Sequence, residues 1–555
     1  MILVGALFMF QFLPAEEIKT PGEISRYTKY SQHEEITVFL SELDHQSEEL
    51  KVKIIGHTKE TREYESRDIY LCIINREKSF RPDELNRKKP TFFFIASQHG
   101  NEQSAKEATL RMIRDLAVGE LNLLLDKVNF LVIPQANPYG NFFDQRHNEQ
   151  DLDLNRDHVK LEAPESRAIH WVFSHWMPEV TIDVHEKGDD YYRVSIGCVS
   201  NANISMELQD FSRKVLLGSV DNELKKHKIS FHEYLITQPM GIDSSAGVTY
   251  TSRETEGRPM MKRYSTSDLN DGRNSLGIYE TISFIQEGAS RHDLETLEER
   301  TRWQYLGIRY VSEAVAKNGE KILSLVDECR RELLERADVF SEDDRVHIRM
   351  KYARNPQDPE LTINQFQRSP SPIRGVLKVD KKAGEPLMRQ DIGPYPYPSE
   401  YRVETVTEKN WFPLVEPTLS VSRPLGYIIP SCRKDVVDTL LHHVLRVEIF
   451  SHDKEIDVEV YTVGEIEPAD YDYLPPKKIM VEKNSRTVVV NKGDFYIPCD
   501  QPGANLIVCL LEPQSLYGLI RYWDYELLPE QAGLFPFFRV VRPAEFPTVP
   551  YKNWH

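Results

Sequence analysis

The chain has 555 residues and a formal net charge of −18 at pH 7, with 40% hydrophobic and 28% charged residues. Its length predicts more than one domain, and its composition is that of an ordinary soluble globular protein. The acidic balance argues against a protein that binds the phosphate backbone of nucleic acids. None of the six cysteines lies in a CxxC pair, which argues against a thiolate zinc site.

The first 14 residues, MILVGALFMFQFLP, are almost wholly apolar. Such a stretch is too short to span a bilayer and is typical of the apolar part of a signal segment. We therefore expect a signal segment over residues 1–20 and a secreted or periplasmic protein. A buried N-terminal strand in a cytoplasmic protein is the alternative. No other stretch of the sequence predicts insertion into a membrane.

The first 320 residues or so alternate predicted strands with predicted helices. A capping-box pattern at Ser31–Glu34 opens a first helix. Further helices are expected over 102–118, 164–176 and 300–316. Strands are expected over 51–56, 69–74, 91–96, 128–134, 180–185 and 278–286. This alternation predicts an α/β domain with a mixed, mainly parallel sheet and helices on both faces.

The composition of the chain changes after about residue 355, where proline becomes frequent and strand-like runs dominate. Strands are expected over 456–463, 486–490 and 506–511, with one helix around 433–443. We expect the α/β domain to cover 21–345 and a smaller β-rich domain to cover 375–555. Aromatic residues of this second domain are expected in its core, with a carbohydrate or peptide platform as the alternative: Tyr471, Tyr473, Tyr522, Trp523 and Tyr525.

The most informative stretch is Thr91–Glu102, TFFFIASQHGNE. Its apolar first half predicts a buried strand, and the helical pattern resumes near Glu102. His99 and Glu102 therefore follow the carboxyl end of a strand, where open α/β sheets place their ligand sites. Zinc in a hydrolase typically takes three such ligands and keeps one position for water.

A third ligand is expected at the end of another strand, and Thr181–His185, TIDVH, meets this condition. Asp183 shares a face with His185 because strand side chains alternate. His185 is therefore the candidate, against other histidines that follow no apolar strand: His147, His158, His170 and His175.

A polar loop carries Arg146 and Arg156, ten positions apart. Two guanidinium groups beside a metal suit an anionic group, since arginine binds carboxylates in a bidentate manner. One arginine is then available for a substrate carboxylate and the other for the oxygen of the scissile carbonyl. A solvated charged loop is the alternative interpretation.

Four motifs occur here in order: HGNE at 99–102, NPYG at 137–140, RxN with DLNR between 146 and 156, and the strand that ends in His185. Together they closely resemble the zinc carboxypeptidases of the carboxypeptidase A/B type, over about residues 27–316. The resemblance implies a zinc ion held by His99, Glu102 and His185.

The resemblance also implies further roles around that metal. Arg146 matches the arginine that polarises the carbonyl, and Asp153 the carboxylate that orients the first zinc histidine. Asn155 and Arg156 match the pair that holds the C-terminal carboxylate of the substrate. Arg67 resembles a further substrate-binding arginine.

The family's general base is a glutamate at the end of a late strand. Glu287 ends the apolar run 282–285, whereas Glu280 precedes it, so we choose Glu287. Arg273 lies in a stretch similar to bacterial members and is expected to line the pocket. The substrate-capping tyrosine has three candidates: Tyr250, Tyr264 and Tyr279.

These features predict a zinc metallocarboxypeptidase that hydrolyses the C-terminal amide bond of peptides with a free terminal carboxylate. A deacylase of N-acyl amino acids from the same superfamily is one alternative. It is disfavoured because Asp157 and His158, rather than Phe-Pro-Gly, follow the Asn-Arg pair. A catalytically inactive peptide-binding protein is the other alternative, although no predicted ligand or base is missing.

Overall fold

The computed structural model describes ten ranges of the chain: 18–62, 64–187, 192–240, 257–264, 266–289, 296–372, 376–380, 385–390, 396–529 and 533–551. The predicted signal segment falls almost entirely outside these ranges, and so does Tyr250. Within them, no helix combines the length and the apolar character needed to cross a membrane.

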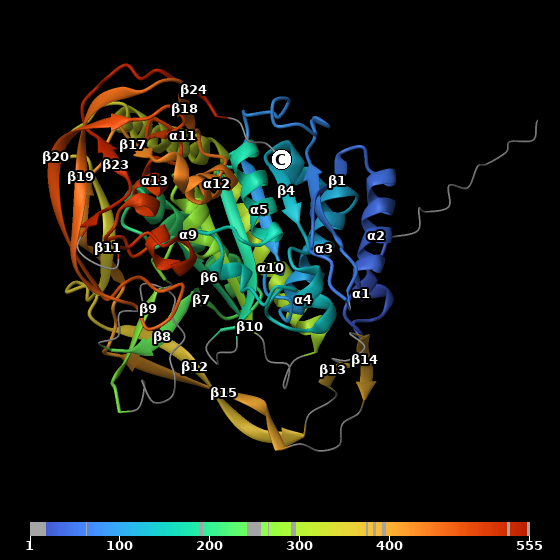
Figure 1. The fold of residues 1–555 in the computed structure, drawn as a ribbon. Helices are drawn as coiled ribbons and strands as arrows, with labels where there is room; N and C mark the ends of the chain where they lie inside the picture. Colours follow the sequence, from blue (N-terminus) through green and yellow to red (C-terminus); the bar gives the residue numbers. More distant parts are fainter. Residues whose placement is uncertain are drawn as a thin grey trace, which may run out of the picture.

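An eight-stranded sheet forms the centre of the N-terminal part, in the order β1-β2-β4-β3-β5-β10-β6-β7 (Figure 1). Its strands are β1 (Leu50–His57), β2 (Asp68–Ile74), β3 (Thr91–Ala96), β4 (Asn129–Ile133), β5 (Val180–Lys187), β6 (Val194–Cys198), β7 (Phe231–Glu233) and β10 (Ile282–Ala289). The pairs β4–β3, β3–β5, β5–β10 and β6–β7 are parallel. The predicted mixed, mainly parallel sheet is confirmed.

Helices cover both faces of this sheet because the side chains of its central strand alternate between two apolar clusters. Phe92 and Phe94 pack with α2 (His33–Gln46), α3 (Gln103–Ala117), α10 (Leu297–Lys317) and α11 (Gly319–Ala337). Phe93 and Ile95 face the opposite side, which α5 (Pro164–Trp176) and α9 (Gly272–Gly277) cover.

Shorter elements complete this part of the chain. They are α1 (Pro21–Ile24), η1 (Asn122–Asp126), α4 (Pro138–Phe143), η2 (Leu154–Arg156), α6 (Met206–Phe211), η3 (Ser212–Leu217), α7 (Gly218–Lys226), β8 (Leu235–Pro239) and β9 (Met260–Tyr264). Several predicted starts shift, including that of α10 from residue 300 to Leu297, and two of the shifts have an identifiable cause. Helix α2 begins at His33 because the Ser31 hydroxyl donates to Glu107 instead of capping the helix. Strand β10 begins at Ile282, since Ile278 still donates to Asn274 at the end of α9.

The C-terminal part is β-rich, as predicted, and is built around a second sheet (Figure 1). Its strands are β17 (Gly426–Ile429), β18 (Glu448–Phe450), β19 (Lys454–Glu467), β20 (Lys478–Val490), β21 (Phe495–Pro498), β22 (Gly533–Leu534), β23 (Phe538–Val540) and β24 (Thr548–Pro550). Its helical elements are η4 (Ser431–Arg433), α12 (Lys434–His442), α13 (Ala504–Leu511), η5 (Leu519–Arg521) and η6 (Trp523–Tyr525).

Residues 506–511 were expected as a strand, and this prediction is wrong because they lie in helix α13. Every residue of α13 is buried. A short run that is apolar on all sides has no periodicity that separates a buried strand from a buried helix.

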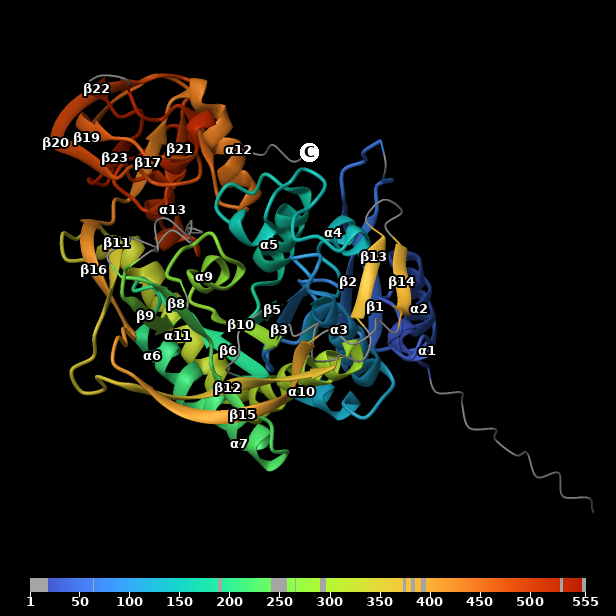
Figure 2. The same ribbon diagram turned by 90° about the horizontal axis from the view of Figure 1, so that it is seen from below.

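Pairs of antiparallel strands connect the two parts: β11 (Arg345–Ala353) with β16 (Leu414–Ser422), β12 (Leu361–Pro372) with β15 (Pro396–Glu408), and β13 (Val376–Asp380) with β14 (Glu385–Gln390). In Figure 1 the β12–β15 pair runs below the eight-stranded sheet, and in both views β13–β14 lies on the side of α1 (Figures 1 and 2).

One apolar cluster holds residues of both parts, and each part also has an apolar cluster of its own. Buried Arg521 of the C-terminal part also donates to Asp268 of the N-terminal part at 2.8 Å. The domain limits of 21–345 and 375–555 stay predictions. Of the aromatic residues, Tyr522 and Tyr525 are buried as expected, whereas Tyr471 and Trp523 are 67% and 55% exposed.

Candidate metal centre and substrate site

The HGNE turn lies between β3 and α3, and its shape depends on a close backbone contact. A Cβ atom on Gly100 would lie 1.9 Å from the carbonyl carbon of Gly140, so only glycine fits at position 100. This contact joins the HGNE and NPYG motifs. The side chains of His99 and Glu102 meet on one side of the turn, with Nδ1 and Oε1 2.7 Å apart.

His185, on β5, completes a buried cluster with these two residues. Its Nδ1 lies 2.8 Å from Oε2 of Glu102 and 3.0 Å from Nδ1 of His99. The ligand atoms of the three residues all lie within 4.8 Å of one another. The structure therefore brings together the three predicted ligands from two neighbouring strand ends.

The hydrogen-bond partners of the two imidazoles show that this cluster fits a cation. Nε2 of His99 lies 3.0 Å from Asp153, and Nε2 of His185 lies 2.7 Å from Asp183. Each Nδ1 atom in turn faces Glu102, at 2.7 Å from His99 and 2.8 Å from His185. With the Nε2 protons donated to Asp153 and Asp183, both Nδ1 lone pairs and the carboxylate of Glu102 face one centre, which is the arrangement that a metal ion satisfies.

The charge of Glu102 agrees with this arrangement. Burial by itself would raise its pKa, but the adjacent imidazoles of His99 and His185 more than offset this effect, and the pKa of Glu102 is lowered. The carboxylate is therefore ionised and available as a ligand at neutral pH.

Arg146 and Asp153 lie beside the first histidine, as predicted. Nε of Arg146 donates to Asp153 at 2.8 Å, and its Nη1 lies 3.8 Å from Oε1 of Glu102. The pKa of Asp153 lies well below its usual range, because His99 and the two arginines, Arg156 and Arg146, outweigh the cost of burial. Asp153 thus links His99 to Arg146 and fixes both.

Asn155 and Arg156 follow on the short helix η2. Nδ2 of Asn155 lies 3.2 Å from Nε2 of His185, and Oδ1 of Asn155 accepts from the backbone of Gly272 at 2.8 Å. Nη1 of Arg156 donates to the carbonyl of Asn155 at 2.6 Å. The half-buried guanidinium therefore lies on the same loop as the residues that surround the metal cluster.

Glu287 lies next to His185, because β5 and β10 are parallel and these two residues are register partners. Burial raises the pKa of Glu287 to about 8, and its neighbours His185 and Glu102 act on it in opposite directions. Glu280 lies before the strand begins, and its carboxylate accepts from the backbone of Ser205 at 2.9 Å. The structure thus brings Glu287, and not Glu280, to the metal cluster.

Among the contacts that the structure describes, none joins the other two predicted substrate arginines to the metal cluster. The guanidinium of Arg67 pairs with Glu34 and lies over the ring of Tyr64. Arg273 is fully buried, where its Nη2 donates to the carbonyl of Thr266 at 2.9 Å. Its Nε and Nη1 have no partner within the part of the chain that the structure describes. The roles of both arginines stay predictions.

The alternative candidates are used elsewhere in the fold. Tyr264 packs edge-on against Trp411, and Tyr279 packs against Phe173. The other histidines have partners of their own: His147 with Asp151, His175 with the carbonyl of Trp171, and His158 with His170.

Sequence reasoning missed several residues that support the cluster. Gln98 donates to Asp183 at 2.7 Å, and Gln304 of α10 donates to the carbonyl of His185 at 2.5 Å. Lys187, two positions after His185, donates to Ser195 at 2.7 Å. The position of Asp183 beside His185 could be predicted from strand alternation. The contacts of Gln98 and Gln304 could not, because they join segments that are far apart in the sequence.

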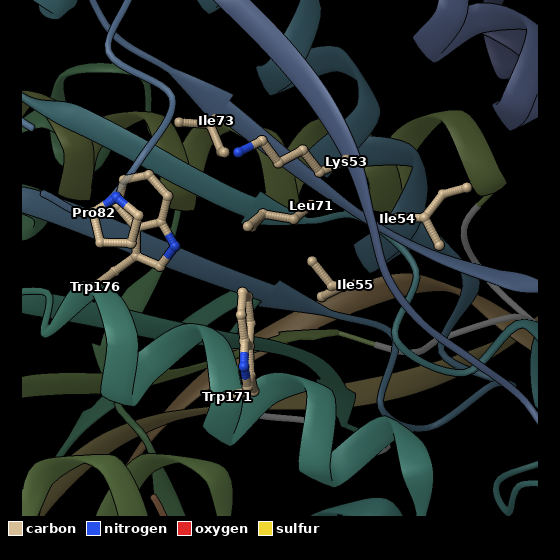
Figure 3. Close-up of a pocket in the computed structure, with 8 residues that line it drawn as sticks. All are labelled: Lys53, Ile54, Ile55, Leu71, Ile73, Pro82, Trp171 and Trp176. Carbon is tan, nitrogen blue, oxygen red and sulfur yellow. The ribbon is translucent and has the colours of Figure 1, made fainter. Parts of the chain in front are cut away.

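A separate apolar hollow of about 250 Å³ lies on the outer edge of the sheet (Figure 3). It is formed between β1, β2 and α5, and none of the predicted site residues lines it. In Figure 3, Trp171 and Trp176 flank it from the α5 side. This hollow belongs to the edge of the fold rather than to the metal cluster.

Comparisons with known proteins agree with the geometry of the cluster. The family model for zinc carboxypeptidases matches residues 36–192. Carboxypeptidase 2 of Trichophyton tonsurans is 22% identical over 460 residues, which cover 80% of this chain and 75% of that protein. Carboxypeptidase SOL1 of Arabidopsis thaliana is 29% identical over 108 residues, which cover 17% of this chain and 22% of that protein.

Among solved structures, a metallo-carboxypeptidase from Burkholderia cenocepacia matches at 16% identity and a TM-score of 0.39, covering 52% of this chain and 70% of that one. A metallo-carboxypeptidase from Pseudomonas aeruginosa, solved with (2-guanidinoethylmercapto)succinic acid, has 19% identity and a TM-score of 0.36, covering 52% of this chain and 68% of that one.

The matched region holds all four motifs. The predicted resemblance to zinc carboxypeptidases is therefore confirmed, by the family model over residues 36–192 and by the similarity to curated carboxypeptidases.

Proposed function

We propose that this protein removes C-terminal residues from peptides by hydrolysis of the terminal amide bond, with zinc held by His99, Glu102 and His185. The observation that carries the proposal is the convergence of these buried ligand atoms, within 4.8 Å of one another, beside a cationic side chain and a second carboxyl group. The cationic group is Arg146, and the carboxyl group is that of Glu287.

The substrate's terminal carboxylate would be bound by Arg156, with Asn155 beside it. A guanidinium forms two parallel hydrogen bonds to a carboxylate, which fixes both the distance and the direction of the chain terminus. Arg156 donates through Nη1 to the backbone, which orients the group without neutralising its charge. The loop that carries Arg156 also carries Asp153, so one segment would hold both the substrate terminus and the first zinc histidine.

Arg146 would stabilise the oxygen of the scissile carbonyl as negative charge develops on it. Its Nε is held by Asp153, while Nη1 points towards the metal cluster at 3.3 Å from Nδ1 of His99. A guanidinium has five N–H donors, so the hydrogen bond to Asp153 leaves other donors of Arg146 available for the carbonyl oxygen.

Glu287 would act as the general base and acid. Zinc bound at this cluster would supply a Lewis acid and lower the pKa of a water molecule to about 7. Glu287 would take a proton from the attacking water and deliver it to the departing amine. A buried carboxyl with a raised pKa exchanges protons near neutral pH, which suits both steps.

The decisive experiment compares two peptides of one sequence, one with a free C-terminal acid and one amidated. The proposal predicts release of the last residue from the free acid and a loss of about 2–5 kcal/mol of transition-state stabilisation for the amide, as for any lost buried charge pair. Equal turnover of both peptides would favour an endopeptidase or a deacylase. No turnover of peptides or acyl-amino acids by the zinc-loaded protein would favour a binding protein.

We also propose that the protein is exported, since residues 1–14 have the composition of a signal segment. Expression of the complete chain with fractionation of the cells tests this point. A mature N-terminus beyond residue 14 in the exported fraction supports it, and an intact chain confined to the cytoplasm contradicts it.

A further inference from the structure

A chain of buried side chains leads away from the metal cluster and does not belong to the ligands themselves. It starts at Asp183, the partner of His185, and continues through Gln98 to His158. The successive distances are 2.7 Å, 2.7 Å and 2.8 Å. All of these side chains are buried.

The chain extends into helix α5 and ends at the C-terminal part of the protein. Nδ1 of His158 lies 3.0 Å from Nε2 of His170. The ring of His170 packs edge-on against His443, with 5.0 Å between the ring centres. His443 follows α12 and is fixed by a 2.9 Å hydrogen bond from Nε2 to the carbonyl of Val159.

Every hydrogen in this chain can be assigned from the chemistry of its members. The carboxylate of Asp183 only accepts, so the Gln98 atom that faces it is the amide nitrogen. The amide oxygen then faces His158, whose Nε2 must donate to it. Burial lowers the pKa of His158 to about 4, so the ring is neutral and its Nδ1 accepts from His170.

The assigned hydrogen bonds therefore all point towards Asp183, which receives one from Gln98 and one from His185. Both contacts reach the same oxygen, Oδ2, and so fix that oxygen beside Nε2 of His185. An acceptor held at this place keeps the proton of His185 on Nε2 and directs its Nδ1 lone pair to the cluster when a metal is bound.

The backbone leaves room for this chain of side chains at Gly272. A Cβ atom on Gly272 would lie 2.8 Å from Oδ2 of Asp183 and 2.8 Å from Nε2 of Gln98. The same glycine donates its backbone N–H to Asn155. The absent side chain at Gly272 thus permits the contact between Gln98 and Asp183.

We propose that Gln98 and His158 are positioning residues that hold Asp183, and through it His185, in the orientation that binds the metal. The proposal rests on the metal site of the proposed function. Neither residue contacts the three ligand side chains through its own side chain among the described hydrogen bonds. Their effect is therefore expected on metal affinity and geometry before it is expected on substrate binding.

The test measures the zinc affinity of the full chain by competition with a chromophoric chelator. His158→Leu and Gln98→Met should each bind zinc about 10–100-fold more weakly than the wild type, the usual effect of losing an outer partner of a metal ligand. His158→Gln keeps a donor near the position of Nε2 and should stay within about threefold of the wild type.

Two further measurements separate positioning from a general loss of structure. The double variant should lose little more than either single variant, because both residues act through the same contact with Asp183. The visible spectrum of the cobalt(II)-loaded protein should change in His158→Leu and be restored in His158→Gln. His175→Leu, a substitution of a half-buried histidine on the same helix as His170, should leave both measurements unchanged.

The inference is overturned if folded His158→Leu binds zinc within about threefold of the wild type, with an unchanged cobalt spectrum. If His158→Leu does not fold, Gln98→Met decides by the same criterion. Additive losses in the double variant would also overturn it, since independent sites add. A wild type that binds no zinc would instead refute the proposed function, so the two failures are distinguishable.

Discussion

The two ends of strand β10 each carry a buried glutamate, and the comparison shows what distinguishes a reactive site from a structural one. Burial raises the pKa of Glu280 to about 7 and that of Glu287 to about 8. Burial and a raised pKa are therefore common to both ends and do not identify the site.

The difference lies in what the surrounding groups offer. At the first end, the backbone of Ser205 donates to Glu280, and arginines lie nearby, including Arg336 and Arg423. At the other end, two imidazole nitrogens and the carboxylate of Glu102 converge, with 3.0 Å between the Nδ1 atoms of His99 and His185. Convergence of metal-ligand atoms, rather than burial, marks the place where a cation and a substrate belong.

The largest expected effect separates the two glutamates directly. Glu287→Gln keeps the shape of the side chain but removes the base, so turnover should fall by about 10²–10⁴-fold. Zinc content and substrate affinity should be retained. The matched control, Glu280→Gln, should turn over peptide at nearly the wild-type rate. Steady-state kinetics with one peptide checks both, and the reverse pattern would show that β10 has been assigned the wrong reactive end.

The next effect tests whether Arg156 binds the C-terminal carboxylate of the substrate beside the metal cluster. Arg156→Ala should cost about 2–5 kcal/mol in transition-state stabilisation, because a bidentate charged contact is lost. The amidated peptide should show no further loss in this variant. Arg331→Ala, an exposed arginine paired with Glu335 on α11, is the control. A full additional loss for the amide would assign carboxylate binding to another residue.

A smaller effect concerns stability at the Glu280 end. Its pKa rises from 4.5 to about 7 on folding, so the folded protein binds the proton more tightly than the unfolded chain. Stability from this group is therefore lost as pH rises through that interval. Glu280→Gln carries no such cost and should be more stable than the wild type by up to about 3 kcal/mol at pH 8.

At pH 4 the advantage of Glu280→Gln should disappear, because the wild-type carboxyl is protonated in both states. Chemical denaturation at the two pH values measures the difference. A variant that is less stable than the wild type at pH 8 would show that ionised Glu280 is stabilised by its arginines.

The smallest effect sharpens the account of the metal end. Gly272→Ala introduces a methyl group 2.8 Å from Asp183 and from Gln98, so the contact between them must lengthen. Zinc affinity should fall by about tenfold, the lower end for a disturbed outer partner. The control is Gly218→Ala, because a Cβ atom there meets nothing within 4 Å. Gly257 is unsuitable as a control, because its positive φ would add backbone strain. Equal zinc affinities in wild type and Gly272→Ala would contradict the account.

The sequence predicted the metal end well because its residues follow short buried strands. Strand β3 and helix α5 have the predicted limits, and His99 and His185 lie where strand ends and alternation placed them. Glu287 was chosen over Glu280 from the apolar run alone, and β10 does begin after Glu280. Local patterns of period two are sufficient for such positions.

Other features depend on contacts between distant segments and leave no local pattern. Helix α13 was taken for a strand because it is apolar all round. The pairing of Arg67 with Glu34 depends on how α2 packs beside β2. The link from His158 to Gln98 joins loops 60 positions apart, and only the folded sheet brings them together.

The central claim is that one zinc ion binds among His99, Glu102 and His185. Anomalous diffraction from a crystal of the zinc-loaded wild type, recorded above and below the zinc edge, tests it most directly. The account predicts a single strong peak in contact with the two Nδ1 atoms and the carboxylate of Glu102. An empty cluster, or a peak held by other residues, would contradict it.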